Sequence, residues 1–239
     1  MQNLKLEQTL LKESGKFGFC LDVKQLDKFD KYADFLVKKN KLMNLTAITD
    51  PVGIAIKHFL DSIVITKLFD FPCNAKVIDV GTGAGFPGIP LKFVRQDFDL
   101  TLVDSLNKRV NFLKDVCALT GVTAECVHAR AEDLSRKLEY RESFDVAVSR
   151  AVAPMNVLAE YAIPYIKVGG VFLAMKGPNV KEELESSKNA VSKLGGTVEL
   201  IKDYSLPEEN KRTIVVIRKS TETDSIYPRN SAKISKKPL

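Results

Sequence analysis

The chain has 239 residues, of which 45% are hydrophobic and 28% are charged, and its formal net charge is +6. A chain of this size buries about 70% of its unfolded surface, so the fold needs no disulfide or metal staple. No uncharged apolar run approaches the ~18 residues of a membrane-spanning helix, and the N-terminus lacks the apolar core of a signal peptide. We therefore expect a cytoplasmic protein with no membrane contact.

The cysteines offer no disulfide or zinc framework. Cys20, Cys73, Cys117 and Cys126 are scattered without a CxxC pair, and the chain has only two histidines. Because their spacing fits no usual zinc pattern, we expect buried free thiols and no metal site.

The first part of the chain shows helical periodicity. Apolar residues recur at steps of three and four in two segments, which the motif NLTAITDP separates. Asp50 followed by Pro51 fits an N-cap and a first-turn proline for the second segment. We expect residues 1–70 to form an N-terminal helical extension. The periodic residues are Leu26, Phe29, Tyr32, Phe35 and Leu36, and then Ile56, Phe59, Leu60, Ile63 and Leu68.

From residue 76, short apolar runs alternate with helical segments such as NKRVNFLKDVCALTG and NVLAEYAIPYI. This alternation predicts an α/β domain over residues 71–218, with a mostly parallel seven-stranded sheet covered by helices on both faces. The last two runs have no helix between them, so we expect them to form an antiparallel pair. Such a sheet is typical of Rossmann-like class I methyltransferases, by analogy of fold alone. The runs are KVIDV, LTLVDS, TAECVHA, FDVAVSR, VFLAMKG, GTVELI and RTIVVIRK.

Residues 219–239 form a basic C-terminal tail. This segment contains five Lys or Arg and two Asp or Glu. Its net charge of +3 is half of the net charge of the chain. A basic tail on a mildly basic protein suits a polyanionic partner. The alternative is a solvated tail that only aids solubility, and charge alone leaves both interpretations open.

The stretch VIDVGTGAGFPGIPLKF places a glycine-rich turn after a short strand. Gly81, Gly83, Gly85 and Gly88 match both GxGxG and GxGxxG, so their spacing fits NAD as well as S-adenosylmethionine (SAM). Asp79 favours SAM, because a carboxylate beside the turn repels a pyrophosphate and attracts the ammonium and sulfonium groups of SAM. The alternative role of Asp79 is to cap the turn.

Two further strand ends carry acidic residues. Asp104 ends the strand LTLVD beside Ser105, and its carboxylate can accept both ribose hydroxyls of a nucleoside. Ala131 and Glu132, in the motif ARAED, follow the third strand, where an adenine edge can be bound. Because parallel strands end at one edge of the sheet, the acids after three strands predict a site for a neutral or cationic nucleoside.

Several motifs occur together over nearly the whole chain: NLTAI, KHFLDS, DVGTGAGFPGIPL, LVDSLNKRVNFL, RAE, SRAVAP and the ending YPRNSAKISKKPL. Together they resemble the ribosomal RNA small subunit methyltransferase G family, also called glucose-inhibited division protein B. The resemblance implies a class I SAM-dependent methyltransferase that modifies N7 of one guanosine in 16S ribosomal RNA. We expect the substrate to be a small-subunit ribosomal particle and the enzyme to be a monomer.

The same resemblance assigns SAM contacts to residues of these motifs, and the residues discussed above extend the set. The implied contacts are Gly81, Gly83, Phe86, Asp104, Ala131, Glu132 and Arg150. To these we add Asp79, Gly85 and Ser105.

Transfer to guanine N7 needs no general base, because this nitrogen has an in-plane lone pair and carries no proton. The enzyme must align N7 with the methyl group to within roughly 3–3.5 Å. The place after the fourth strand reads SRAVAP and lacks the Asn/Asp-Pro-Pro-aromatic run of exocyclic amine methylation. The only Pro-Cys pair, Pro72-Cys73, precedes the first strand, which disfavours transfer to cytosine C5. A ring nitrogen is therefore the favoured acceptor.

Two residues are candidates for the reacting end of the site. Arg150 ends the fourth strand, so it should reach the ligand-binding edge and contact SAM or the target, although a surface ion pair is the alternative. His58 shares a helical face with Asp61 and Ser62, and a helix-stabilising His58–Asp61 pair is one interpretation. The family resemblance favours a target-side role for His58.

Two other functions remain open from the residues alone. An NAD-binding oxidoreductase fits the GxGxxG pattern from Gly83 but not Asp79. A non-catalytic SAM-binding or RNA-binding protein would keep the same fold without activity.

Overall fold

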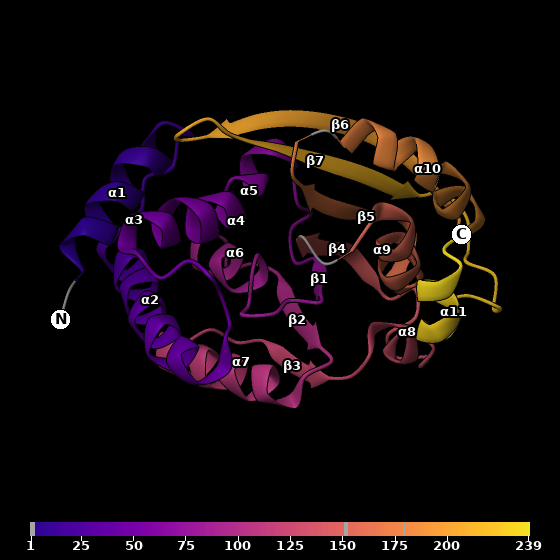
Figure 1. Ribbon diagram of the computed structural model, residues 1–239, viewed down its shortest axis with the longest axis horizontal. Coiled ribbons are helices and arrows are strands. Elements are labelled where there is room, and N and C mark those ends of the chain that lie inside the picture. The colour runs from indigo at the N-terminus through magenta and orange to yellow at the C-terminus, as the bar shows by residue number, and fades with distance from the viewer. Residues whose placement is uncertain (1–2, 151–152, 179) are drawn as a thin grey trace.

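Within the described chain, seven strands form a single sheet in the order β3-β2-β1-β4-β5-β7-β6 (Figure 1). The computed structural model describes residues 3–150, 153–178 and 180–239. Strands β1 to β5 are parallel, and β7 is antiparallel to both of its neighbours. The predicted mostly parallel sheet with a final antiparallel pair is confirmed. The strands are β1 (Lys76–Val80), β2 (Asp99–Asp104), β3 (Glu125–His128), β4 (Phe144–Arg150), β5 (Ile166–Lys176), β6 (Gly196–Leu206) and β7 (Asn210–Lys219).

Helices cover both faces of this sheet (Figure 1). Val77 and its neighbour Ile78 belong to different hydrophobic clusters, because successive strand residues point to opposite faces. Residues of α1, α2, α6 and α7 belong to the cluster on the first face, and residues of α8, α9 and α10 belong to the cluster on the second. Burial on both faces explains the nearly continuous apolar runs of the sequence. The helices are α1 (Leu4–Gly15), α2 (Val23–Met43), α6 (Gly88–Val94), α7 (Asn107–Thr120), α8 (Ala131–Leu134), α9 (Met155–Ala162), α10 (Val180–Lys193) and, in the tail, α11 (Ser231–Lys236).

The second periodic segment of the N-terminal extension is helical but changes pitch along its length. Asp50 caps it as predicted, because its carboxylate accepts a hydrogen bond from the Gly53 amide at 2.7 Å beside Pro51. One stretch is a π-helix, whose wider turn is common at functional sites. The elements are α3 (Pro51–Gly53), the π-helix η1 (Ile54–Leu60), α4 (Asp61–Ile63) and α5 (Ile65–Leu68).

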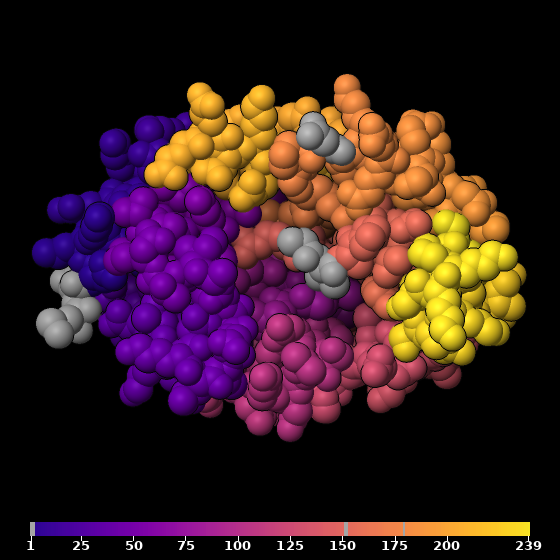
Figure 2. All heavy atoms as spheres, viewed as in Figure 1, coloured from indigo at the N-terminus to yellow at the C-terminus, as the bar shows by residue number. Residues whose placement is uncertain are grey.

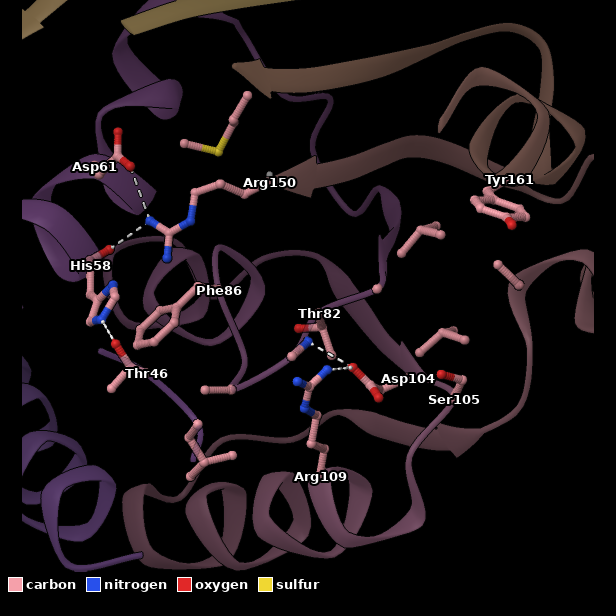
Figure 3. Close-up of a pocket in the computed structure, with 18 of the residues that line it drawn as sticks. Thr46, His58, Asp61, Thr82, Phe86, Asp104, Ser105, Arg109, Arg150 and Tyr161 are labelled. Atoms are coloured by element: carbon pink, nitrogen blue, oxygen red, sulfur yellow. Dashed lines mark hydrogen bonds and ion pairs between the residues drawn. The ribbon is translucent and has the colours of Figure 1, made fainter. Parts of the chain in front are cut away.

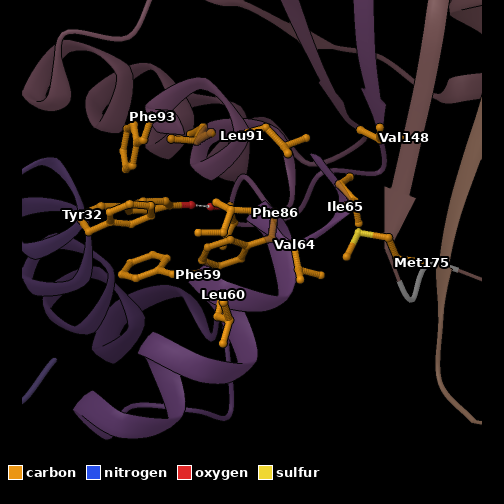
Figure 4. Packing of buried hydrophobic residues seen from close by; sticks show 14 of the residues in the cluster. Tyr32, Phe59, Leu60, Val64, Ile65, Phe86, Leu91, Phe93, Val148 and Met175 are labelled. Atoms are coloured by element: carbon orange, nitrogen blue, oxygen red, sulfur yellow. Dashed lines mark hydrogen bonds between the residues drawn. The ribbon is translucent and has the colours of Figure 1, made fainter. Parts of the chain in front are cut away.

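Aromatic side chains join this extension to the glycine-rich turn (Figure 4). The Tyr32 ring of α2 stacks on Phe86 at a centroid distance of 5.3 Å and lies 5.5 Å from Phe59. The Tyr32 hydroxyl donates a hydrogen bond to the Ala84 carbonyl, and burial raises the pKa of Tyr32 well above its usual value. A neutral phenol from the extension therefore supports the turn directly, and both parts share one hydrophobic cluster.

The basic tail packs on the α/β domain instead of extending into solvent. Lys219 is the last residue of β7 and is buried, and its ammonium lies 2.9 Å from the Glu142 carboxylate. Arg229 pairs with the fully buried Glu160 of α9 at 2.7 Å. Lys219 and Arg229, two of the five cations of the tail, are therefore paired with carboxylates of the α/β domain. Ile234 of α11 is fully buried as well.

The four cysteines are all free. Cys117 is buried and Cys126 is partly buried, but Cys20 and Cys73 are exposed, so the prediction of buried thiols is wrong for these two. Both exposed cysteines lie in the connections between elements and not on an apolar face. Across the described residues, none of the helices has the length and apolar character required to span a membrane.

Candidate active site

A cavity of about 730 Å³ opens at the carboxyl ends of the parallel strands. Figure 2 shows a hollow near the middle of one face, with the N-terminal helices on one side and the C-terminal half of the chain on the other. Its wall includes the ends of β1, β2, β4 and β5, contributed by Val80, Asp104, Arg150 and Lys176. Figure 3 shows Asp104 and Arg150 among the lining residues. This is the edge where open α/β sheets bind ligands, and the volume suits a small molecule.

The glycine-rich turn forms the floor of the cavity. Gly81 and Gly83 line it with φ values of 71° and 60°, a left-handed conformation that favours glycine. A Cβ atom on Gly83 would meet no protein atom within 4 Å, so the space beside it is open to a ligand. Gly85 does not line the cavity: a Cβ there would lie 2.7 Å from the Tyr32 hydroxyl and from Ile89, so its role is packing.

Asp79 lies behind the turn and not on the cavity wall. It is fully buried, and its Oδ2 accepts hydrogen bonds from the Thr82 hydroxyl at 2.7 Å and the Gly88 amide at 2.8 Å. Its Oδ1 has no partner among the described residues. Burial raises the pKa of Asp79 to about 6. This geometry matches the turn-capping alternative, and a direct contact between Asp79 and SAM remains a prediction.

Asp104 and Ser105 line the cavity at the end of β2, as expected. The Asp104 carboxylate accepts hydrogen bonds from the Gly83 amide at 3.0 Å and the Leu106 amide at 2.9 Å, and it lies 3.5 Å from Arg109. These contacts fix its orientation at the cavity wall. An oriented acceptor of this kind fits the ribose hydroxyls of a nucleoside.

Ala131 and Glu132 begin α8 directly after β3 and also line the cavity. Glu132 is buried, and Arg130 lies 3.9 Å from its carboxylate. The Ala131 carbonyl accepts a hydrogen bond from the Tyr165 hydroxyl at 2.7 Å, which holds the start of α8 in place. The structure therefore brings these residues together with Asp104 and the two lining glycines, as the sequence predicts.

Arg150 occupies the opposite end of the cavity (Figure 3). Its guanidinium carbon lies 5.0 Å above the Phe86 ring, and one nitrogen, Nη1, makes all of its described hydrogen bonds. The Arg150 side chain is only 14% exposed, so its ion pair with Asp61 is buried and the alternative of a surface ion pair is wrong. The Nη1 partners are the carbonyls of Lys57 and His58 at 3.3 Å, Asp61 at 3.1 Å and the Ser62 hydroxyl at 3.3 Å.

His58 lines the same end of the cavity, and its ring stacks on Phe86 at 4.6 Å. Its Nε2 lies 2.7 Å from the Thr46 hydroxyl, and its buried Nδ1 has no partner within the described part of the chain. Burial and the neighbouring Arg150 charge lower the pKa of His58 to about 4. The carboxylate of Asp61 is bound by Arg150, so the simple His58–Asp61 pair is not the arrangement that forms.

The cavity also contains residues that the sequence did not single out. Thr46 lies in the motif NLTAI, which contributes to the family resemblance but was not assigned to the site from the sequence. Arg212 lies near the start of β7; because β7 is antiparallel, its first residues reach the edge where the parallel strands end. The other lining residues not predicted include Thr82, Arg109, Tyr161, Met175 and Lys176.

Comparison with known proteins identifies the chain's relatives. The family model for rRNA small subunit methyltransferase G matches residues 25–215. The chain belongs to this family. It is 46% identical to a Ribosomal RNA small subunit methyltransferase G of Desulforamulus reducens over 97% of both chains. It is 48% identical to the protein of the same name from Clostridium kluyveri over the full length of both.

Solved structures with low sequence identity confirm the fold. TrmN from Thermus thermophilus superposes with a TM-score of 0.53 at 14% identity, over 67% of this chain and 48% of that chain. The [4+2]-cyclase SpnF gives a TM-score of 0.54 at 13% identity, over 68% and 81% of the two chains. The predicted class I methyltransferase fold and the family resemblance are both confirmed. Ala151 and Val152 of the family motif SRAVAP lie outside the described residues.

Proposed function

We propose that this chain transfers the methyl group of SAM to N7 of a specific guanosine in 16S ribosomal RNA. Membership of the methyltransferase G family, shown by full-length relatives, is the observation that carries the proposal. The family also disfavours the oxidoreductase and the non-catalytic binding protein. Ribosomal RNA as substrate supports a cytoplasmic enzyme, and we propose that it acts as a monomer on a small-subunit particle.

The donor end of the cavity fits SAM. Gly83 leaves open space beside the turn, Asp104 presents an oriented carboxylate, and Glu132 follows β3 on the same edge. SAM supplies an electrophilic methyl group when bound. The role of these residues is to bind the nucleoside and fix the direction in which that methyl group points.

The acceptor end fits a reaction that depends on alignment and not on proton transfer. Because its pKa is about 4, the His58 imidazole is neutral at physiological pH, and it stacks on Phe86 beside the Arg150 guanidinium. Guanine N7 has no proton to lose, so neither residue needs to act as a base. Their role is to hold the target nucleotide with N7 in line with the methyl group, an effect that can lower the activation barrier by several kcal/mol.

The test is to incubate the protein with SAM that carries an isotopically labelled methyl group, using protein-free 16S RNA and small-subunit particles as separate substrates. Mass spectrometry of nuclease fragments then locates the label. We expect one labelled guanosine, carrying the methyl group at N7. A label on an exocyclic amine, or no label on either substrate, would overturn the proposal. A thermal shift given by NAD and not by SAM would instead support the oxidoreductase.

A further inference from the structure

Asp61, the first residue of α4, connects three separate strands at the edge of the cavity. Its carboxylate is buried, and its Oδ2 accepts a hydrogen bond from Arg150 of β4 at 3.1 Å. Its Oδ1 accepts a hydrogen bond from the Tyr204 hydroxyl of β6 at 3.1 Å and lies 3.5 Å from Nε of Arg212 of β7. One carboxylate from the N-terminal extension thus binds two guanidinium groups from the sheet.

This arrangement leaves positive charge and unused donors at the cavity wall. Arg150 and Arg212 both line the cavity, and a single carboxylate balances only one of their two charges. In the part of the chain that the structure describes, Nη2 and Nε of Arg150 have no protein partner, and neither does Nη2 of Arg212. Guanidinium groups bind phosphate and carbonyl oxygens in a fixed planar geometry, so these free N–H groups suit a ligand.

Arg212 lies at the boundary between the cavity and a second hollow. Arg212 also lines a second, neighbouring hollow of about 780 Å³ between β6, β7 and the start of α10. Lys181 and Lys211 contribute to the wall of that hollow, together with the acidic Glu182 and Asp203. A strand whose target base enters the first cavity would therefore meet Arg212 at the boundary between the two.

We propose that Asp61 is a positioning residue for methyl transfer. It fixes Arg150 at the reacting end of the cavity and Arg212 at the RNA entrance, and so sets the target nucleotide relative to the methyl donor. The inference rests on the proposed function. Asp61 need not touch the substrate, because it acts through the two arginines, and Tyr204 holds the carboxylate from behind.

The first experiment replaces Asp61 with asparagine, which keeps the shape and removes the charge. We expect the single-turnover rate at saturating SAM and RNA to fall by about 10- to 100-fold, because misaligned reactants lose much of the rate. The matched control is Glu160→Gln. This substitution neutralises a fully buried carboxylate that pairs with Arg229 outside the cavity, so it should lower the unfolding temperature comparably and leave the rate within about twofold of wild type.

A double-mutant cycle separates positioning from a general loss of stability. If Asp61 acts through Arg150 and Arg212, then Asp61→Asn should reduce the rate of Arg150→Ala by clearly less than it reduces the wild-type rate, and it should reduce the rate of the Arg150→Ala/Arg212→Ala variant by no more than about twofold. Tyr204→Phe removes only the hydroxyl behind Asp61, preserves the buried ring and should slow the reaction by about threefold or more. A wild-type rate for Asp61→Asn or for Tyr204→Phe, or penalties of Asp61→Asn and Arg150→Ala that multiply, would overturn the proposal. Failure of the proposed function is distinguishable, because the wild-type protein would then transfer no methyl group at all.

Discussion

Among single residues, His58 is notable because its surroundings keep it uncharged. Burial and the Arg150 charge both disfavour the imidazolium form and lower the pKa of His58 to about 4. The ring therefore gains a proton only as the pH falls toward 4, and it does not titrate near neutrality. We expect the single-turnover rates of wild type and His58→Gln to show pH profiles of the same shape between about pH 5.5 and pH 8. If only the wild-type profile contained a step near the ordinary histidine pKa of about 6.5, His58 would be a titrating catalytic group.

The second residue-level prediction concerns the methyl donor. Asp104→Ala should weaken SAM binding by about 1–3 kcal/mol, because ribose hydroxyls lose a charged acceptor. The substitution also frees the Gly83 and Leu106 amides that the carboxylate now orients. Isothermal titration calorimetry measures the change, and Asp99→Ala, at the exposed first residue of the same strand, is the matched control. Equal SAM affinity in both variants would remove Asp104 from the site.

The third residue-level prediction concerns Arg150. Arg150→Ala should slow methylation at saturating SAM by on the order of 10²-fold while the fold survives, because the reaction depends on alignment. Arg150→Lys should restore only part of the rate: an ammonium can replace the contacts of Nη1, but it lacks the second nitrogen that faces the cavity. Single-turnover kinetics on methylatable RNA measure both variants. A near-normal rate for the alanine variant would show that Arg150 has no part in the reaction.

At this scale the sequence predicts which residues come to the edge of the sheet, but not the direction in which each points. Asp79 and Asp104 both stand near the end of a strand before a turn or loop, and the sequence assigns both to SAM. The structure places Asp104 on the cavity wall and Asp79 behind the turn. The difference arises because the chain folds back over Asp79, so that the Gly88 amide binds its carboxylate. A contact nine residues along the chain cannot be derived from local spacing.

At the scale of secondary-structure elements, the strands were easier to predict than the irregular helices. Apolar periodicity predicts a helix from Ile56 to Leu68, and the structure confirms one, but it does not predict the π-helical turn η1. Carbonyls of Lys57 and His58, near the end of this turn, accept hydrogen bonds from Arg150. These carbonyls are therefore bonded to a side chain more than 90 residues away in sequence, a contact that the side-chain pattern of the helix does not encode.

The antiparallel pairing of β7 is an element-level feature with a consequence for the site. The sequence predicts the hairpin from two apolar runs without a helix between them, and the sheet confirms it. Because β7 runs opposite to β5, its first residues lie at the carboxyl edge of the parallel strands, and this brings Arg212 to the cavity. The residue could have been found from the predicted topology, since a cation at the start of a strand that runs opposite to the parallel strands must lie near that edge.

At the scale of the whole molecule, the N-terminal extension is part of the catalytic domain's core and not a separate module. Residues of α1 and α2 share a hydrophobic cluster with the first face of the sheet, and α4 supplies the carboxylate that binds Arg150. The π-helix η1 contributes His58 to the cavity wall. The extension therefore lines the end of the cavity that we propose for the acceptor, whereas the end proposed for the donor is lined by the glycine-rich turn, the end of β2 and the start of α8.

The C-terminal tail has two parts with different roles in the molecule. Lys219 and Arg229 hold the segment against the domain through Glu142 and Glu160, so their charges are not available to a polyanion. The remaining cations are exposed on and after α11, which lies at the opposite end of the molecule from α1 (Figure 1). Deleting the whole tail would leave Glu160 buried without its partner, which is strongly destabilising. A test of RNA binding by the tail must therefore keep the Arg229–Glu160 ion pair.

That test is to replace Lys233, Lys236 and Lys237 together with glutamine. The side chains are exposed, so we expect the fold and SAM affinity to be unchanged. If all three lysines neutralise RNA phosphates, the slope of log K against log salt should become shallower by about 2, since each contact on a single strand contributes roughly 0.7. Binding measured from about 50 to 200 mM salt gives the slope. The matched control replaces three exposed lysines at the other end of the molecule: Lys5, Lys12 and Lys24. An equal slope for the two triple variants would mean that the tail cations serve solubility, whereas a change confined to the tail variant would place the RNA against α11.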